Sequence, residues 1–204
     1  MKRNKLVIIG AGGLGVMTLD AALEMNCYEE IVFVDDNKKI DELIHGYKVI
    51  GGIEQLSEID NEADYIIAIA NNRIRKKIAE QYDLNYVNII HPNTSISRLS
   101  KIGIGNIIMP NSTIDPEVVI ENHVIINKNN SLGHSAIMEN YTQAAPGCKL
   151  TGLVKEGSFI GLGGIILTGA IVGSWSTIGA GAVVIKDIPD HATAVGVPAK
   201  IIKE

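Results

Sequence analysis

An aliphatic residue recurs at every sixth position through the second half of the chain. The run comprises Ile102, Ile108, Ile114, Ile120, Ile126, Leu132, Met138, Ala144 and Leu150, then shifts its phase by two residues and continues as Val154, Ile160, Ile166, Val172, Ile178 and Val184. A small residue follows most of them four positions later, with Asn106 and Asn130 as exceptions. This period is too long for an amphipathic helix and too regular for a β-sandwich. It is typical of a β-helix, in which each six-residue unit forms a short strand and a turn and three units close one coil.

The first half of the chain has a different pattern, in which strand and helix signals alternate as in parallel α/β proteins. Predicted strands cover residues 6–9, 31–34, 65–70 and 86–90, and predicted helices cover residues 17–25 and 72–81. The segment 91–94 is expected to be a linker, because its proline restricts the preceding residue and lacks an N–H donor. The sequence therefore predicts a Rossmann-like α/β domain over residues 1–92 and a β-helix over residues 93–204.

The composition narrows the possible partners. A net charge of −5 provides no basic surface for nucleic acid or an anionic membrane. No apolar stretch approaches the ~20 residues that span a bilayer, and the basic start Met1–Lys5 leads into a strand rather than a targeting segment. Cys27 and Cys148 lie far apart, which argues against a disulfide framework and fits a reducing compartment. We expect a soluble, cytoplasmic protein with no nucleic-acid or membrane partner.

A glycine-rich loop separates the first predicted strand from the first predicted helix. Residues 10–15, Gly-Ala-Gly-Gly-Leu-Gly, fit the pattern G-x-G-x-x-G, and Asp35 follows at the end of the second predicted strand. Such a loop holds a phosphate with backbone N–H groups and a helix N-terminus, while the carboxylate accepts from a ribose or a base. Taken alone, the loop predicts NAD binding. The domain is too short for a full dinucleotide fold, so a nucleoside diphosphate suits it better.

The six-residue repeat, the α/β front half and the closing segment Val-Gly-Val-Pro-Ala-Lys at 195–200 together resemble a known family. These are the sugar acetyltransferases of the sialic acid O-acetyltransferase (NeuD) and UDP-4-amino-sugar N-acetyltransferase (PglD) type, and the resemblance covers nearly the whole chain. It implies a left-handed β-helix and a homotrimer with active sites where the β-helices meet. It also implies acetyl-CoA as co-substrate, no metal, and N-acetylation of a nucleotide-activated amino sugar.

Acetyl transfer needs a base, a thioester held close and donors for the developing oxyanion. Histidine suits the base, because its pKa lies near neutrality. The resemblance assigns this role to His134, near a coil turn, and an active-site role to Asn127. Ser135 stands where the family usually has Asp or Glu, so the imidazole lacks an adjacent charge and another group must orient it. The alternatives are a solvent-facing turn residue for His134 and a turn-ladder asparagine for Asn127.

The acetyl-CoA contacts implied by the resemblance are Gln143, Gly152, Leu162, Gly179, Ala180, Pro198 and Lys200. Gln143 stands where relatives often have a histidine, and it can donate to a thioester carbonyl but cannot titrate. An 18-residue coil is expected to place Gly152 above His134, where small residues let an extended pantetheine approach the backbone. The alternative is that these glycines serve only the turns.

The sugar-nucleotide contacts implied by the resemblance are Gly10, Gly12, Gly13, Leu14, Asp35, Asp36, Asn71 and Asn72. Leu14 departs from a histidine that some relatives place in this loop. The alternatives are strand-end solvation for the aspartates and a helix cap for the asparagines. The charge run from Arg73 to Lys77 is predicted to be a solvated helix face.

Four other functions are compatible with these residues. The same machinery would O-acetylate a sialic acid or another sugar, although Ser135 favours an amine because a hydroxyl needs a stronger base. The glycine-rich loop permits a nicotinamide-dependent oxidoreductase. A zinc enzyme of the β-helix carbonic anhydrase type would need about three grouped histidines, and the repeat holds only His123 and His134. A trimeric scaffold without activity is compatible with Ser135 and Gln143.

Overall fold

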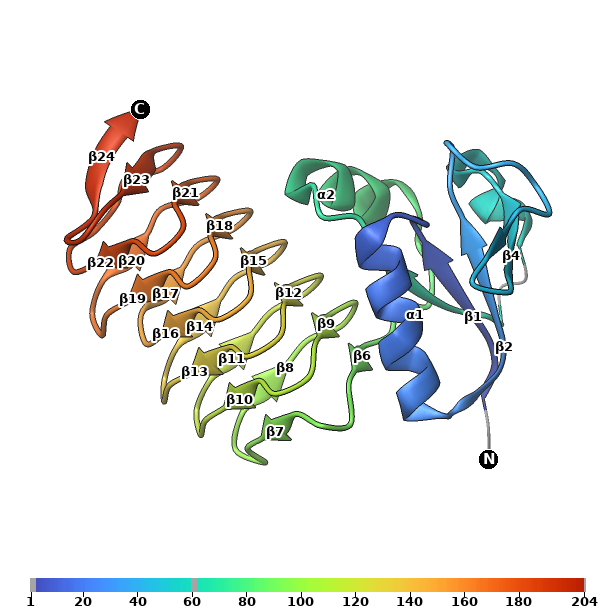
Figure 1. The fold of residues 1–204 in the computed structure, drawn as a ribbon, viewed down its shortest axis with the longest axis horizontal. Helices are drawn as coiled ribbons and strands as arrows, with labels where there is room; N and C mark the ends of the chain where they lie inside the picture. The colour runs from blue at the N-terminus through green and yellow to red at the C-terminus, as the bar shows by residue number, and fades with distance from the viewer. Residues whose placement is uncertain (1–2, 60–61, 204) are drawn as a thin grey trace.

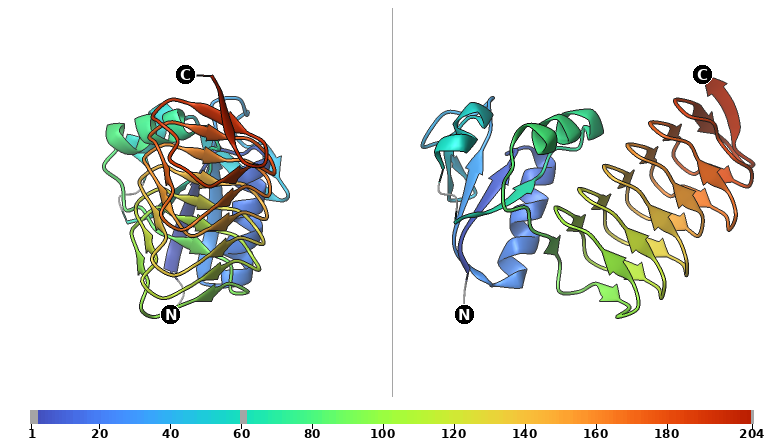
Figure 2. Two further views of the ribbon diagram at one scale, coloured as in Figure 1. Left: turned by 90° about the vertical axis from the view of Figure 1, so that its left-hand side faces the viewer. Right: turned by 180° about the vertical axis from the view of Figure 1, so that it is seen from behind.

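The chain folds into two units that lie end to end (Figures 1 and 2). The computed structural model describes residues 3–59 and 62–203, so Met1 and Lys2 of the basic start lie outside the described residues. An α/β unit contains the N-terminal half, and a left-handed parallel β-helix extends from it to the C-terminus at the far end. The predicted fold class is therefore confirmed.

The α/β unit is built on a five-stranded sheet with the order β3-β4-β2-β1-β5. Its elements are β1 (Arg3–Ile9), α1 (Gly13–Met25), β2 (Tyr28–Val34), β3 (Leu43–Ile44), β4 (Tyr47–Gly51), the 3₁₀ helix η1 (Ile53–Glu58), β5 (Asp64–Ile67) and α2 (Asn72–Gln81). The strands pair in parallel except for the hairpin of β3 and β4. The apolar run 6–9 of β1 is fully buried, as expected of a parallel strand covered on both faces. The sequence pattern did not indicate the hairpin or η1.

The β-helix has three faces, each named here after one of its strands. The β12 face contains β6 (Ile89–Ile90), β9 (Ile107–Ile108), β12 (Ile125–Ile126), β15 (Gln143–Ala144), β18 (Phe159–Ile160), β21 (Thr177–Ile178), β23 (Thr193–Val195) and β24 (Lys200–Lys203). The β13 face contains β7 (Ser95–Ile96), β10 (Thr113–Ile114), β13 (Ser131–Leu132), β16 (Lys149–Leu150), β19 (Ile165–Ile166) and β22 (Val183–Val184). The β14 face contains β8 (Lys101–Ile102), β11 (Val119–Ile120), β14 (Ile137–Met138), β17 (Leu153–Val154) and β20 (Ile171–Val172).

Turns join these faces at three corners. The His134 corner joins the β13 face to the β14 face through turns such as 133–136, and the α2 corner joins the β14 face to the β12 face through turns such as 139–142. The Leu162 corner joins the β12 face to the β13 face through turns such as 161–164. The repeated aliphatic side chains point inward from all three faces and form one continuous core, which confirms the six-residue pattern.

The two asparagines that depart from the small-residue pattern hold neighbouring coils together. Asn106 and Asn130 are buried, and their side-chain oxygens accept the backbone N–H groups of Val124 and Cys148, each 18 residues later, at 2.7 Å. The hydroxyl groups of Ser112, Ser158 and Ser176 accept the corresponding N–H groups on other coils, so both residue types hydrogen-bond the next coil.

The phase shift lies in a shortened turn at the His134 corner. Residues 151–152 join β16 to β17 with two residues where 133–136 use four. Since Ile137 pairs with Leu153, Gly152 lies over Ala136 and not, as expected, over His134. A Cβ atom at Gly152 would collide with the carbonyl oxygen of Ala170, so the turn requires glycine.

The predicted strand 86–90 is divided between the two units. Tyr86 makes a single bridge to Tyr65 of β5, whereas β6 begins the β12 face. The segment 91–94 forms a turn of the Leu162 corner rather than a free linker. Within residues 3–59 and 62–203, no helix is long and apolar enough to cross a bilayer.

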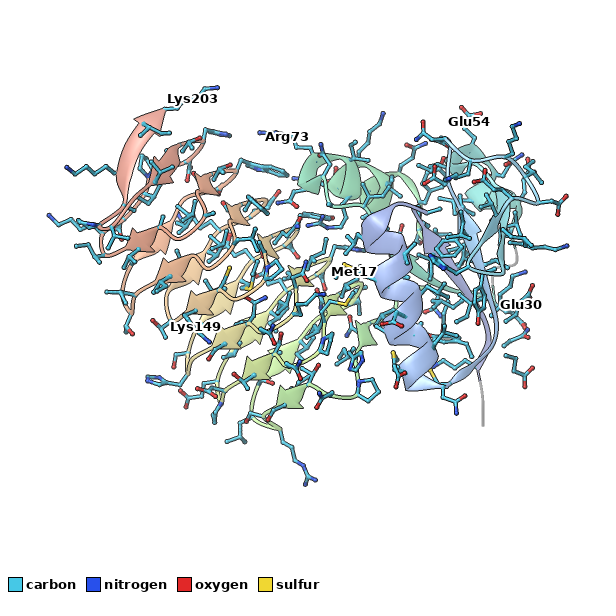
Figure 3. The ribbon with its side chains drawn as sticks, viewed as in Figure 1. Met17, Glu30, Glu54, Arg73, Lys149 and Lys203 are labelled. Carbon is cyan, nitrogen blue, oxygen red and sulfur yellow. The ribbon has the colours of Figure 1, made fainter. Side chains whose placement is uncertain are left out.

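The two units share a core where α1 packs on the β12 face. Met17 of α1 points toward the β-helix (Figure 3) and packs in the same apolar cluster as Ile107 and Ile125. In each two-residue strand of the β-helix one side chain points inward and the other outward. In β6, β9 and β12, the strands nearest α1, the outward residue is an isoleucine, because α1 covers it.

Candidate active site

A cavity of about 410 Å³ lies at the carboxyl ends of β1, β2 and β5, beside the start of α1. Its lining includes the predicted residues Gly10, Gly12, Gly13, Leu14, Asp35 and Asp36, together with Val34, Asn37, Ile53, Ala68, Ile69, Ala70 and Ile74. The structure therefore brings the glycine-rich loop and the acidic pair together. This is the edge of an open parallel sheet where ligands generally bind.

Close backbone packing fixes the shape of the glycine-rich loop. Gly10 has φ +105°, and a Cβ atom at Gly15 would collide with the carbonyl oxygen of Gly10. Gly12 caps α1 without a side chain, so the first N–H groups of the helix have no side-chain acceptor and are available to a ligand. None of the residues lining this cavity in the described chain is Lys or Arg, and the helix N-terminus supplies its positive field.

Both aspartates brace the cavity wall. Asp35 Oδ2 accepts from the backbone N–H of Ala11 at 2.7 Å, and its Oδ1 accepts from that of Asn37 at 2.8 Å. Asp36 Oδ1 accepts from the backbone N–H of Ile53 at 2.7 Å. A carboxylate oxygen carries more than one lone pair, so these bonds leave acceptor capacity toward a ligand.

Asn71 and Asn72 lie beside this cavity and have structural partners of their own. Asn71 caps α2, because its side-chain oxygen accepts from the N–H groups of Arg73 and Ile74 at 3.0 and 3.1 Å. Asn72 joins α2 to the β-helix by donating from Nδ2 to the carbonyl oxygen of Gly157 at 2.9 Å. The helix-cap alternative thus describes Asn71.

Arg75 contradicts the expected solvated helix face. Its side chain is completely buried, and its guanidinium donates to carbonyl oxygens of both units. Its acceptors are the oxygens of His123 (2.8 Å), Ile69 (2.8 Å), Ala70 (3.5 Å), Tyr141 (2.8 Å) and Thr142 (3.3 Å) and Asn72 Oδ1 (2.9 Å). Burial lowers the pKa of Arg75 to about 9, which keeps it charged at neutral pH. Arg75 therefore ties the wall of the first cavity to the turns of the α2 corner.

His123 belongs to the contact between the two units that Arg75 makes, and its role there is structural. Its ring stacks on Tyr141 at 5.4 Å and meets Tyr86 edge-on at 4.7 Å. Burial, and secondarily the charge of Arg75, lowers the pKa of His123 to about 4. A neutral imidazole packed between two tyrosines is a structural group.

A second cavity of about 490 Å³ lies between the start of α2 and the β12 face. It is lined by Ala70, Asn71, Asn72, Arg73, Gln143, Gly157, Phe159, Trp175, Ser176 and Thr177. Ala70 lines both cavities, so they adjoin. Gln143 is only 9% exposed, and its Oε1 has no hydrogen-bond partner within the described chain. The sequence reasoning missed Phe159 and Trp175, although an outward aromatic in a six-residue repeat was a visible signal.

His134 and Ser135 are exposed at the His134 corner. The Ser135 hydroxyl donates to Glu117 Oε2 at 3.0 Å, from the coil below. Glu117 thus places a carboxylate beside Ser135, at the position where relatives usually have Asp or Glu in the turn itself. An 18-residue coil would have identified it, because Glu117 stands 18 positions before Ser135.

The remaining predicted residues lie on other parts of the β-helix. Asn127, Leu162, Gly179 and Ala180 are at the Leu162 corner, whereas Gly152 is at the His134 corner and Gln143 is on the β12 face. Pro198 and Lys200 are at the C-terminal end, where both are exposed. Asn127 uses its Oδ1 locally, accepting from the N–H of Lys128 at 2.9 Å. Lys149, on the β13 face between the two corners, lies on the side away from the α/β unit (Figure 3). One chain therefore does not bring His134 together with the Leu162 corner.

The described residues offer the zinc alternative no ligand set. Among residues 3–59 and 62–203, no three His, Cys, Asp or Glu side chains gather in a way that would hold a metal ion.

Comparisons with known proteins cover both units. Residues 5–82 match the PglD N-terminal domain family. The acetyltransferase domain of PglB from Neisseria gonorrhoeae, solved in complex with acetyl coenzyme A, is 35% identical with a TM-score of 0.93, and the alignment covers 99% of this chain and 100% of that one. A variant of perosamine N-acetyltransferase from Caulobacter crescentus, in complex with CoA and GDP-perosamine, is 26% identical with a TM-score of 0.74, covering 98% and 97% of the two chains.

A curated relative matches a shorter segment. The dTDP-3-amino-3,6-dideoxy-alpha-D-galactopyranose 3-N-acetyltransferase of Aneurinibacillus thermoaerophilus is 49% identical over 49 residues, which cover 24% of this chain. The chain spans about a quarter of the length of that relative, 26%. The likeness to the PglB domain extends over essentially all of both chains at more than 30% identity. The chain belongs to the PglD-like family of hexapeptide-repeat sugar acetyltransferases.

Proposed function

We propose that this protein transfers the acetyl group of acetyl-CoA to the amino group of a nucleotide-linked amino sugar. The observation that carries the proposal is the pair of adjoining cavities, one at a helix N-terminus suited to phosphates and one on the β-helix face that carries Gln143. Relatives support it, because the names of two of them specify N-acetyl transfer to an amino sugar and the solved PglB domain binds acetyl coenzyme A. The same names favour an amine over the hydroxyl of a sialic acid.

The first cavity would hold the nucleoside diphosphate. The N–H groups of Gly13 and Leu14 at the start of α1 would donate to the phosphate oxygens, and the helix dipole would favour their negative charge. Asp35 and Asp36 would accept from the ribose or the base. The sugar would then extend past Ala70 toward Gln143.

The chemical step would proceed by direct attack on the thioester. The lone pair of the sugar nitrogen attacks the carbonyl carbon, the carbon–sulfur bond breaks, and the CoA thiolate leaves. His134 accepts the proton that the nitrogen loses and can pass it to the thiolate. The side-chain amide of Gln143 is suited to donate to the developing oxyanion.

Acetyl-CoA would lie between two chains. The glycines at 163 and 181 on the Leu162 corner face open space, so an extended pantetheine can approach the backbone there. His134 occupies another corner, so a second copy must supply it. The outward residues Val119, Ile137 and Leu153 of the β14 face are apolar and only partly buried, which suits a contact with that copy. We propose a homotrimer, in which the His134 corner of each copy meets the Leu162 corner of the next and the three contacts close into a ring.

The test is acetyl transfer by the purified protein. Acetyl-CoA is supplied with GDP-perosamine, the dTDP-3-amino sugar, a UDP-4-amino sugar and the corresponding sugars that carry only hydroxyl groups. Release of the CoA thiol and mass spectrometry of the product report the reaction. Acetylation of an amino sugar supports the proposal, whereas acetylation of hydroxyl sugars alone, or of nothing, contradicts it.

Two glycines of the loop give a matched pair of variants. Gly15→Ala is expected to lower the free energy of unfolding by about 1–3 kcal/mol, because its methyl group would meet the carbonyl of Gly10. At Gly13 a methyl group meets no atom within 4 Å, so Gly13→Ala should leave the fold intact. That methyl group would instead obstruct the phosphates and weaken nucleoside diphosphate binding by about tenfold. Thermal unfolding measures the effect on stability, and calorimetry measures the effect on binding. Unchanged binding of the nucleoside diphosphate by Gly13→Ala would show that this loop does not hold the phosphates.

A further inference from the structure

Trp175 occupies a backbone position that is unfavourable for a large side chain. It has φ +58°, in the left-handed region, at a turn position of the α2 corner that holds Gly105 and Gly157 in two other coils and His123, Tyr141 and His191 in the others. Bulky residues rarely adopt this conformation, because their side chains crowd the backbone. Asparagine and glycine tolerate it better. The fold alone would therefore be served at least as well by either residue.

The indole of Trp175 forms one wall of the second cavity. It packs against the backbone of Gly157, where a Cβ atom would collide with the ring. The guanidinium of Arg73, at the end of α2 nearest the β-helix (Figure 3), lies 4.4 Å from the ring centroid. Phe159, which points outward from the β12 face and is only partly buried, lines the same cavity.

A buried polar atom lines the same cavity. Gln143 Oε1 has no hydrogen-bond partner within the described chain, although the residue is only 9% exposed. An unpaired buried acceptor is costly, and because this one lines a cavity it can accept from a donor group of a ligand. The cavity therefore combines two aromatic rings, a cation and an unsatisfied acceptor, next to the cavity assigned to the nucleotide.

We propose that this second cavity binds the sugar ring of the substrate and that Trp175 is a specificity-determining residue. The C–H groups of the ring contact the indole and Phe159, and the amino group of the sugar donates to Gln143 Oε1. The inference rests on the proposed function, since it assigns a place to the sugar of a nucleotide-linked substrate.

Trp175 is the only tryptophan of the chain, so its fluorescence reports on this cavity and on the neighbouring surface cavity that the indole forms with Lys76, Lys77 and Glu80 of α2. The purified protein is titrated with GDP-perosamine, the dTDP-3-amino sugar and a UDP-4-amino sugar, and separately with GDP, dTDP and UDP. Calorimetry on the same samples records binding by another signal. A nucleotide sugar is expected to shift the emission, because it displaces water from the indole, whereas the matching nucleoside diphosphate binds with little shift. Binding of a nucleotide sugar without any shift overturns the subsite. If calorimetry detects no nucleotide sugar at all, the proposed function fails and the subsite fails with it.

The variant Trp175→Asn separates recognition from folding. Asparagine suits the left-handed turn, so the Tm should stay near that of the wild type, while the KM for the nucleotide amino sugar rises about tenfold. The KM for acetyl-CoA should not change. Tyr141→Asn is the matched control: Tyr141 occupies the same turn position two coils earlier, with φ +59°, and does not line the cavity. A lowered Tm with an unchanged KM in Trp175→Asn would show that the indole serves only to hold α2.

Discussion

Replacing His134 with glutamine is expected to lower kcat for acetyl transfer by about 10²–10⁴-fold, the usual contribution of a general base. Glutamine keeps a similar size and hydrogen-bonding capacity but cannot accept the proton of the amine. His134 is exposed, so its loss should leave the Tm and the KM values close to those of the wild type. Steady-state kinetics and thermal unfolding are measured on the same samples.

The structure supplies a control for this variant on the same β-helix. His191 is exposed at the α2 corner, where its backbone adopts a positive φ. The variant His191→Gln should therefore keep full activity. An equal loss of kcat in both variants, or an unchanged kcat in His134→Gln, would show that His134 is not the general base.

The variant His134→Gln also tests whether two chains share an active site. Ala180 is exposed at the Leu162 corner, and Ala180→Trp should block acetyl-CoA there. Each variant alone should be inactive, but a mixed oligomer contains some sites with an intact His134 from one chain and an intact Leu162 corner from another. Recovery of activity on mixing supports the shared site. Persistent inactivity of verified mixed oligomers contradicts it.

Replacing Arg75 with methionine is expected to cause the largest loss of stability, about 3–5 kcal/mol. The variant removes a completely buried guanidinium and leaves several carbonyl oxygens of both units without a donor. Hydrogen bonds from charged donors are stronger than those between neutral groups. Each buried carbonyl oxygen left without a donor also destabilises the folded state by the full free energy of its desolvation. For a chain of this size, the Tm should fall by about 10 °C.

Lys77 provides the comparison on the same helix. It is exposed, so Lys77→Met should change the free energy of unfolding by no more than about 0.5 kcal/mol. Arg75→Lys should fall between the two, because it keeps the charge but loses the planar fork that reaches several carbonyls at once. A stability of Arg75→Met equal to that of Lys77→Met would show that the two units are held together without this residue.

Local sequence rules predicted much of the first cavity. The glycine-rich loop and Asp35 were recognisable because a strand, a tight turn and a helix N-terminus occupy consecutive residues. The same rules failed for Arg75, which was expected in solvent. A charge run on a helix is usually exposed, and here the turns of the α2 corner cover one of its members.

The sequence alone determined the β-helix, its inward residues and the place of its phase shift. Each six-residue unit contacts mainly its neighbours in the stack, so a repeat in the sequence is a repeat in space. Only the tertiary structure decided what lies against the outside of the coils: Glu117 beside Ser135, α2 against Tyr141, and Gln143 in a cavity with Trp175. The six-residue period assigns a side chain to a face or a corner, but which other part of the fold covers it depends on long-range packing that no local pattern records.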